Sequence, residues 1–220
     1  MEQLNEPNLL KKTLVTSDIA LGFTSVKRPK TSNNRKVFVN FRDWFDSDVK
    51  ERALLVIEKI VALGHEVEFI STCQGISSYR DDSKLHDEII NLYQQKHGNI
   101  NYLTANRAKY SSENLISYLS EFGSYYIGMR LHMSISALLA GLPVLNFGYE
   151  PKNIGVLSSI GLEQYAADFF GPIEVMESMI EDMLDGDYSE KTKEVHVALT
   201  KGRELFERSF LTLNKEMELF

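Results

Sequence analysis

The chain has 220 residues, of which 43% are hydrophobic and 25% charged, a balance that is typical of a globular protein and excludes a disordered or fibrous one. This length suffices for one α/β domain with a sizeable core and some extra helix at an end, whereas two full domains would be a tight fit. The formal net charge of -7 argues against non-specific nucleic-acid binding, because neutralising phosphates requires a surplus of Lys and Arg on some face.

Cysteine usage and hydropathy indicate the compartment. Cys73 is the single cysteine, so no internal disulfide can form and a reducing compartment is expected. The first residues contain no basic stretch followed by an apolar one, and no window approaches the ~20 apolar residues of a membrane span. We therefore expect a cytoplasmic protein.

The chain begins with a polar, irregular stretch. Residues 26–35 read VKRPKTSNNR and combine Pro, Ser, Asn and cations without periodicity, so residues 1–34 are expected to act as a linker. Residues 35–220 are expected to form the ordered domain. This domain opens with KVFVNFRDW (36–44), whose alternating β-branched and aromatic residues predict a strand. Residues 48–64 follow with helical spacing and end in a glycine, which predicts a helix.

The strand–helix pattern then repeats along the chain. Further strands are predicted at 66–72, 100–104, 124–128 and 143–149, and further helices at 83–97, 111–123 and 133–142. Such alternation, with helices of about 10–15 residues, predicts right-handed crossovers and a parallel sheet covered on both faces. After the fifth strand the sequence predicts only helices and loops, ending in a long charged helix from about residue 189 to 220 that packs across the outside of the sheet or onto another body. The predicted fold class is therefore α/β, a single Rossmann-like parallel-sheet domain with an extra C-terminal helix.

Basic side chains follow several predicted strands. Arg42 follows the first strand, Arg130 and His132 follow the fourth, and Lys152 follows the fifth. The carboxyl ends of parallel strands carry the ligand site, so these groups are expected at one edge of the sheet. Such a cluster suits a ligand with phosphate or carboxylate groups. Arg130 and His132 are two residues apart, so in an extended turn both side chains would point the same way.

Less specific interpretations compete with this one. A lone arginine beyond a strand is often a solvated charge or an ion-pair partner, and Asp82 ahead of a helix is more often a cap than an acid. His86 is expected to be a solvated side chain on a helical face. No two histidines or carboxylates have metal-ligand spacing, so we expect no metal and no cofactor. No Gly-x-Gly-x-x-Gly follows the first strand, which argues against a standard dinucleotide-binding fold.

Three segments carry a resemblance to a known family. They read NFRDW (40–44), STCQGISSYRDDS (71–83) and IGMRLHMSISALLAGLPVLNFGYEPKN (127–153). They resemble the C-terminal half of the polysaccharide pyruvyl transferase family, over about residues 14–165. The resemblance implies one Rossmann-like half of a two-domain GT-B protein. It also implies transfer of a pyruvyl group from phosphoenolpyruvate to a hydroxyl of a sugar or lipid-linked oligosaccharide acceptor in surface polysaccharide synthesis.

The resemblance also implies roles for single residues. Arg130, Leu131 and His132 match the turn that holds phosphoenolpyruvate, and Arg42 matches a basic residue that follows the first strand of this half. Arg42 and Arg130 would neutralise the phosphate and carboxylate of the donor, and His132 would protonate the departing phosphate or the methylene carbon.

Three further residues receive supporting roles from the same resemblance. Lys152 and Asn153 would be additional donors, and Asp82 would orient a cation or a sugar hydroxyl. The family's N-terminal half has no counterpart in this sequence, and residues 1–34 are interpreted as its remnant. We therefore expect the donor-binding half alone, with a second copy of the chain or a separately encoded N-terminal half as its partner.

Two other functions fit the same pattern. A nucleotide-sugar glycosyltransferase would share the GT-B half, but it needs an acidic or aromatic residue that binds the ribose and base. Glu150 is the candidate for this residue. A partial paralog without catalytic activity would serve as a binding module, and exposed hydrophobic positions on the helix at 189–220 would favour it.

Overall fold

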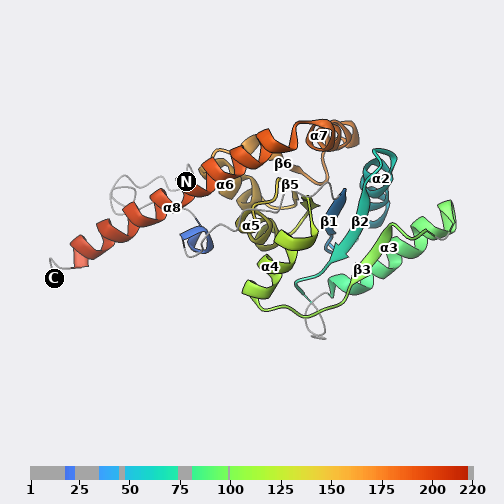
Figure 1. Ribbon diagram of the computed structural model, residues 1–220, viewed down its shortest axis with the longest axis horizontal. Helices are drawn as coiled ribbons and strands as arrows, with labels where there is room; N and C mark the ends of the chain where they lie inside the picture. Colours follow the sequence, from blue (N-terminus) through green and yellow to red (C-terminus); the bar gives the residue numbers. More distant parts are fainter. Residues whose placement is uncertain (1–17, 23–34, 45–47, 74–80, 99, 218–220) are drawn as a thin grey trace.

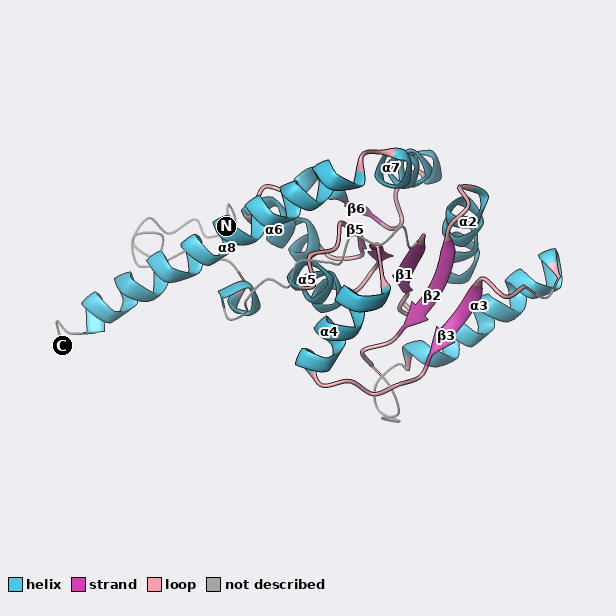
Figure 2. Ribbon diagram, viewed as in Figure 1, coloured by secondary structure: helices cyan, strands magenta, loops and turns pink. Residues whose placement is uncertain are grey.

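The computed structural model describes residues 18–22, 35–44, 48–73, 81–98 and 100–217, with side chains described up to residue 212. The expected linker at 1–34 therefore lies largely outside the described residues. In the described part, helices cover both faces of one sheet, whose strands form the middle layer in Figure 2. The predicted Rossmann-like α/β domain is confirmed.

The sheet has six parallel strands in the order β3-β2-β1-β4-β5-β6. The strands are β1 (Lys36–Asn40), β2 (Glu66–Ile70), β3 (Leu103–Asn106), β4 (Tyr125–Gly128), β5 (Val144–Gly148) and β6 (Ala166–Asp168). The helices are α2 (Val49–Ala62), α3 (Asp82–His97), α4 (Ser112–Phe122), α5 (Leu131–Leu139), α6 (Pro151–Ser159), α7 (Ile173–Asp185) and α8 (Tyr188–Met217), with 3-10 turns η1 (Ile19–Gly22) and η2 (Glu163–Tyr165).

Two hydrophobic cores lie on opposite faces of the sheet. Along β1, Val37 and Val39 point into the first core, where α2, α3 and α7 pack, while Phe38 points into the second core with α4, α5, α6 and α8. This alternation follows from the two-residue period of a strand, and apolar residues on both sides are expected for a central parallel strand. Figure 1 shows the two groups of helices on either side of the strands.

Some predicted boundaries are wrong. A sixth strand, β6, follows the five that the sequence predicts. Helix α5 begins at Leu131 rather than Met133, and helix α6 begins at Pro151, soon after β5. Proline suits that position because its missing N–H would have no intrahelical acceptor there.

Helix α8 continues well past the body of the domain. Its residues Val195, Ala198 and Leu199 are buried in the second core, so the helix packs across the outside of the sheet as predicted. Its C-terminal end extends away from the strands in Figure 1. Val197, Phe210 and Leu211 on this helix are exposed. None of the helices in the described ranges has both the length and the apolar character needed to span a bilayer.

Strands β1 and β4 meet at the point where the strand order reverses. The chain runs outward from β1 through β2 to β3 and then returns to β4 on the other side of β1. In such sheets the loops beyond the carboxyl ends of the two central strands leave in opposite directions and open a place for a ligand. Arg42 follows β1 and Arg130 follows β4, so both residues stand at this point.

The end of β4 tolerates no side chain. Gly128 pairs in register with Asn40 of β1 and Asn146 of β5, and a Cβ at Gly128 would lie 2.6 Å from both the Asn40 carbonyl oxygen and the Tyr126 hydroxyl. We expect Gly128→Ala to lower the free energy of unfolding by about 1–3 kcal/mol, because backbone must move to admit the methyl group. Urea titration measures it.

The matched control for this substitution is Gly155→Ala. Gly155 lies in the interior of α6, and a Cβ there would meet nothing within 4 Å. Alanine should stabilise the helix there by about 0.5–1 kcal/mol. Equal unfolding midpoints for the two variants would contradict the close packing at the end of β4.

Candidate functional site

Arg130 forms a two-point ion pair with Asp82. Arg130 is the N-cap residue of α5, and its Nε and Nη2 lie 2.9 and 2.5 Å from the two carboxylate oxygens of Asp82. The Asp82 side chain is 0% exposed and that of Arg130 is 16% exposed. A planar guanidinium and a carboxylate form two parallel hydrogen bonds in this geometry, so the ion pair fixes the orientation of the Arg130 side chain.

Asp82 is held in place from several sides. It is the first residue of α3, and its backbone N–H donates to the carbonyl of Cys73 at 3.2 Å. Asn40 Nδ2 donates to Asp82 Oδ2 at 3.3 Å and to the Ile70 carbonyl at 2.8 Å. Burial raises the pKa of Asp82, while hydrogen bonds from Arg130 and Asn40 and the charge of Arg42 oppose that rise.

The same pair keeps Arg130 charged. Burial works against its charge, but the hydrogen bonds and negative charge of Asp82 outweigh this, so the pKa of Arg130 is raised. The bidentate contact occupies Nε and Nη2 of the guanidinium. Arg130 therefore offers an incoming anion its remaining donors, from a direction that Asp82 sets.

Arg42 lies in a different environment. Its Nη1 donates to the Tyr149 hydroxyl at 2.6 Å, and its Cζ lies 5.3 Å from the ring centroid of Trp44 and 5.4 Å from that of Tyr149. The centroids of the two rings are 4.3 Å apart. Within the described ranges no carboxylate forms a salt bridge with Arg42, and its buried Nε has no hydrogen-bond acceptor. Neutral groups therefore hold this cation.

His132 does not lie beside Arg130 in an extended turn. The prediction that their side chains point the same way is wrong, because α5 begins at Leu131 and His132 is an exposed residue of its first turn. Leu131 is 9% exposed and packs in the second core. Of these three consecutive residues, Arg130 is in the ion pair with Asp82, Leu131 is in the core and His132 is on the surface.

The two predicted donors after β5 also separate. Lys152 is exposed, and its Nζ lies 2.6 Å from Glu150 Oε2. Asn153 is 1% exposed, and its Nδ2 donates to Asn146 Oδ1 and to the Met129 carbonyl, both at 3.0 Å. Asn153 thereby ties the first turn of α6 to the ends of β4 and β5.

The sequence analysis did not predict four residues whose side chains contact others at the carboxyl edge, namely Asn40, Trp44, His86 and Tyr149. His86 was predicted to be solvated, which is wrong, because it is 0% exposed. Its Nε2 lies 3.1 Å from both the amide nitrogen and the carbonyl oxygen of Phe41, and burial lowers its pKa to about 3. A signal was available for Trp44 and Tyr149, since each is an aromatic residue just beyond the carboxyl end of a strand.

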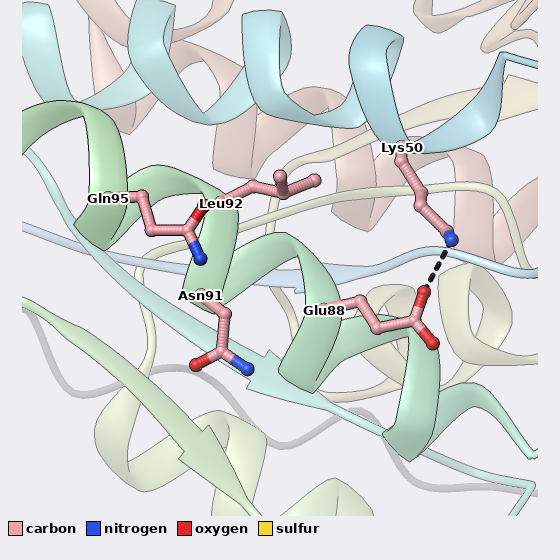
Figure 3. A pocket seen from close by; sticks show the side chains of 5 residues that line it. All are labelled: Lys50, Glu88, Asn91, Leu92 and Gln95. Atoms are coloured by element: carbon pink, nitrogen blue, oxygen red, sulfur yellow. Dashed lines mark ion pairs between the residues drawn. The ribbon is translucent and has the colours of Figure 1, made fainter.

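A shallow hollow lies elsewhere on the surface, between α2 and α3 (Figure 3). It has a volume of about 250 Å³ and is lined by Lys50, Glu88, Asn91, Leu92 and Gln95. Lys50 and Glu88 form an ion pair there at 2.5 Å. The hollow includes none of the residues at the carboxyl edge. Within the part of the chain that the structure describes, no three His, Cys, Asp or Glu side chains are grouped to hold a metal ion.

The chemistry of the carboxyl edge follows from its charges. Arg130 pairs with the buried carboxylate of Asp82, and the charge of Arg42 also acts to lower the pKa of that carboxylate, so two guanidinium groups and one carboxylate influence each other at this edge. The three side chains come from loops that follow β1, β2 and β4. Such an arrangement suits a small anion with carboxylate or phosphate oxygens.

Solved structures with a similar fold are glycosyltransferases. An O-GlcNAc transferase variant of Thermobaculum terrenum superposes with a TM-score of 0.58 and 12% identity, covering 90% of this chain and 37% of that one. A glycosyltransferase of Siraitia grosvenorii in complex with UDP has a TM-score of 0.51 and 14% identity, covering 84% of this chain and 45% of that one. At these identities the likeness concerns the fold, which is that of one Rossmann-like half of a GT-B protein.

Two sequence comparisons agree on one family. The amylovoran biosynthesis protein AmsJ of Erwinia amylovora is 28% identical over 113 residues, which are 51% of this chain and 26% of that protein. The match thus spans about a quarter of the length of this curated relative. The family model described as polysaccharide pyruvyl transferase matches residues 1–151, a range that contains Arg42, Asp82 and Arg130. The chain belongs to the polysaccharide pyruvyl transferase family.

Proposed function

We propose that the chain binds phosphoenolpyruvate at the carboxyl edge of the sheet and serves the transfer of its pyruvyl group to a sugar hydroxyl of a surface polysaccharide. One observation carries the proposal: Arg130 pairs with the buried carboxylate of Asp82, whose pKa the charge of Arg42 also acts to lower, at the point where the strand order reverses. Family membership supports pyruvyl transfer as the reaction class, and the relative named for amylovoran biosynthesis supports a polysaccharide as the product.

The site residues would divide the chemistry among them. Formation of a ketal joins two sugar oxygens to C2 with loss of their two hydroxyl protons. One proton is added to the methylene carbon of the donor, and the other goes to the departing phosphate, which also takes the electrons of the broken C–O bond. Arg42 and Arg130 stabilise the negative charge on the carboxylate and the departing phosphate. His132, exposed on the first turn of α5, is the candidate acid for one of these protons.

Other predicted residues act indirectly in this proposal. Asp82 and Asn153 are buried and bonded to protein groups, so we assign them the positioning of Arg130 and of the β4 and β5 ends. Lys152 is an exposed cation near the edge, and Leu131 anchors α5 in the core. The acceptor side is proposed to come from a second copy or a separately encoded N-terminal half. Sedimentation of the chain alone, with a dimer for the first case and a monomer for the second, separates the two.

Calorimetric titration of the full chain with phosphoenolpyruvate tests the proposal. We expect saturable binding, and we expect Arg130→Ala and Arg42→Ala each to weaken it at least about tenfold, because each removes charge-assisted hydrogen bonds to an anion. Arg208→Ala on the exposed surface of α8 is the matched control and should bind as the wild type does.

Two results of this titration would refute the proposal. One is a heat signal that does not saturate with phosphoenolpyruvate. The other is undiminished affinity in Arg130→Ala. Titration with UDP-glucose forms the competing arm, and tighter binding of this nucleotide sugar would favour the glycosyltransferase alternative instead.

A further inference from the structure

We infer that Tyr149 and Trp44 position the guanidinium of Arg42, and that Arg42 so held is the principal electrostatic anchor for an anionic ligand at the carboxyl edge. The naming of phosphoenolpyruvate as that ligand rests on the proposed function above. The positioning itself rests on the contacts that join the loop after β1 to the loop after β5.

Two side chains contact Arg42 in two ways. Its Nη1 donates a hydrogen bond, 2.6 Å long, to the Tyr149 hydroxyl. The rings of Trp44 and Tyr149 have centroids 5.3 and 5.4 Å from Cζ and add cation–π contacts. A long, flexible side chain is thereby held in one orientation before any ligand arrives, which lowers the entropic cost of binding.

The charges of the two arginines are balanced differently. Arg130 has a carboxylate partner at 2.5 Å, so much of its field is cancelled by Asp82. Arg42 has a phenol and two aromatic rings as partners, and in the described ranges it forms no salt bridge. A phenol and a π face hold a cation without neutralising it. In the described ranges, the guanidinium of this edge that has no carboxylate within salt-bridge distance is therefore that of Arg42.

Trp44 supplies a direct probe, because it is the single tryptophan of the chain. Its ring lies against the guanidinium of Arg42, so its fluorescence should respond to the position of that group. Saturation of a fluorescence change with phosphoenolpyruvate gives a Kd for each variant. The emission of the ligand-free protein reports the positioning separately.

A double-mutant cycle decides whether Tyr149 acts through Arg42. Tyr149→Phe keeps the ring and removes the hydroxyl, and we expect it to raise the Kd for phosphoenolpyruvate about fivefold, the usual net worth of one intramolecular hydrogen bond. In the Arg42→Ala background the same change should have no further effect. Tyr165→Phe is the matched control, since its hydroxyl donates to Glu194 at 2.6 Å away from this edge.

The outcomes separate the inference from the proposed function. Equal effects of Tyr149→Phe with and without Arg42 would overturn the positioning role, and so would unchanged binding in Tyr149→Phe. If the wild type does not bind phosphoenolpyruvate, the proposed function fails. The inference then stands or falls on the ligand-free Trp44 emission, which Arg42→Ala and Tyr149→Phe should shift and Tyr165→Phe should not.

Discussion

Replacing Asp82 by alanine is expected to lower the free energy of unfolding by about 3 kcal/mol. Removal of one partner of a buried ion pair leaves the other charge without compensation, at a typical cost of about 3–5 kcal/mol. The Arg130 side chain is 16% exposed and can recruit some water, so the lower end applies. The Asn40 side chain also loses the acceptor that lies 3.3 Å away.

Asp82→Asn should cost less than Asp82→Ala. An amide oxygen still accepts a hydrogen bond from the guanidinium, and no cavity forms, so we expect about 1–2 kcal/mol. Urea unfolding at neutral pH measures both variants. Formate at millimolar concentration should raise the stability of Asp82→Ala more than that of the wild type, because the small carboxylate can bind in the space left beside Arg130.

Glu88→Gln is the matched control for these variants. Glu88 lies on the same helix, α3, and also pairs with a cation, Lys50, at 2.5 Å. This pair is exposed, with side chains 53% and 46% accessible, so its loss should change stability by less than about 0.5 kcal/mol. An Asp82→Ala variant as stable as Glu88→Gln would show that the buried pair does not support the fold.

Most of the sheet could be predicted from local sequence, since each of the first five strands has apolar or β-branched runs and is followed by a helical segment. Strand β6 could not, because Ala166–Asp168 is three residues long, carries no β-branched residue and lies at the edge of the sheet. The start of α5 was misplaced for a related reason. Its N-cap residue is Arg130, which makes no side-chain capping bond, so no Ser, Thr, Asp or Asn marks the boundary.

The candidate site was predicted only in part. Arg42 and Arg130 follow strands directly, so the rule for carboxyl ends locates both. The pairing of Arg130 with Asp82 requires that the start of α3 lie near the end of β4, which depends on the strand order β3-β2-β1-β4. Alternation of strands and helices does not encode that order. The contact of Trp44 with Tyr149 depends on the same long-range arrangement.

Acid should destabilise the protein through His86 well before most carboxylates titrate. Burial lowers the pKa of His86 in the folded state to about 3, from the ordinary histidine value of about 6.5. Below pH 6.5 the imidazole therefore binds a proton in the unfolded chain but not in the folded chain, and the free energy of unfolding falls as the pH drops from 6.5 towards 3. Between pH 7 and pH 5 this group alone should remove about 2 kcal/mol.

The histidine also connects acid sensitivity to the site. His86 Nε2 contacts the backbone of Phe41, the residue before Arg42. His86 and Phe41 are both 0% exposed, so a proton on the ring has no access to water and the loop must open to hydrate it. In the folded protein the ring stays neutral down to about pH 3, so ligand affinity should not fall through His86 between pH 7 and pH 5.

Urea unfolding of the wild type and His86→Gln from pH 7 to pH 5 measures the effect. The variant starts less stable, because glutamine fits the imidazole site imperfectly, but its stability should change by about 2 kcal/mol less over this range. His196→Gln, at an exposed position of α8, is the control and should keep the wild-type slope. Parallel curves for the wild type and His86→Gln would mean that the folded protein admits a proton at this ring, contrary to its burial.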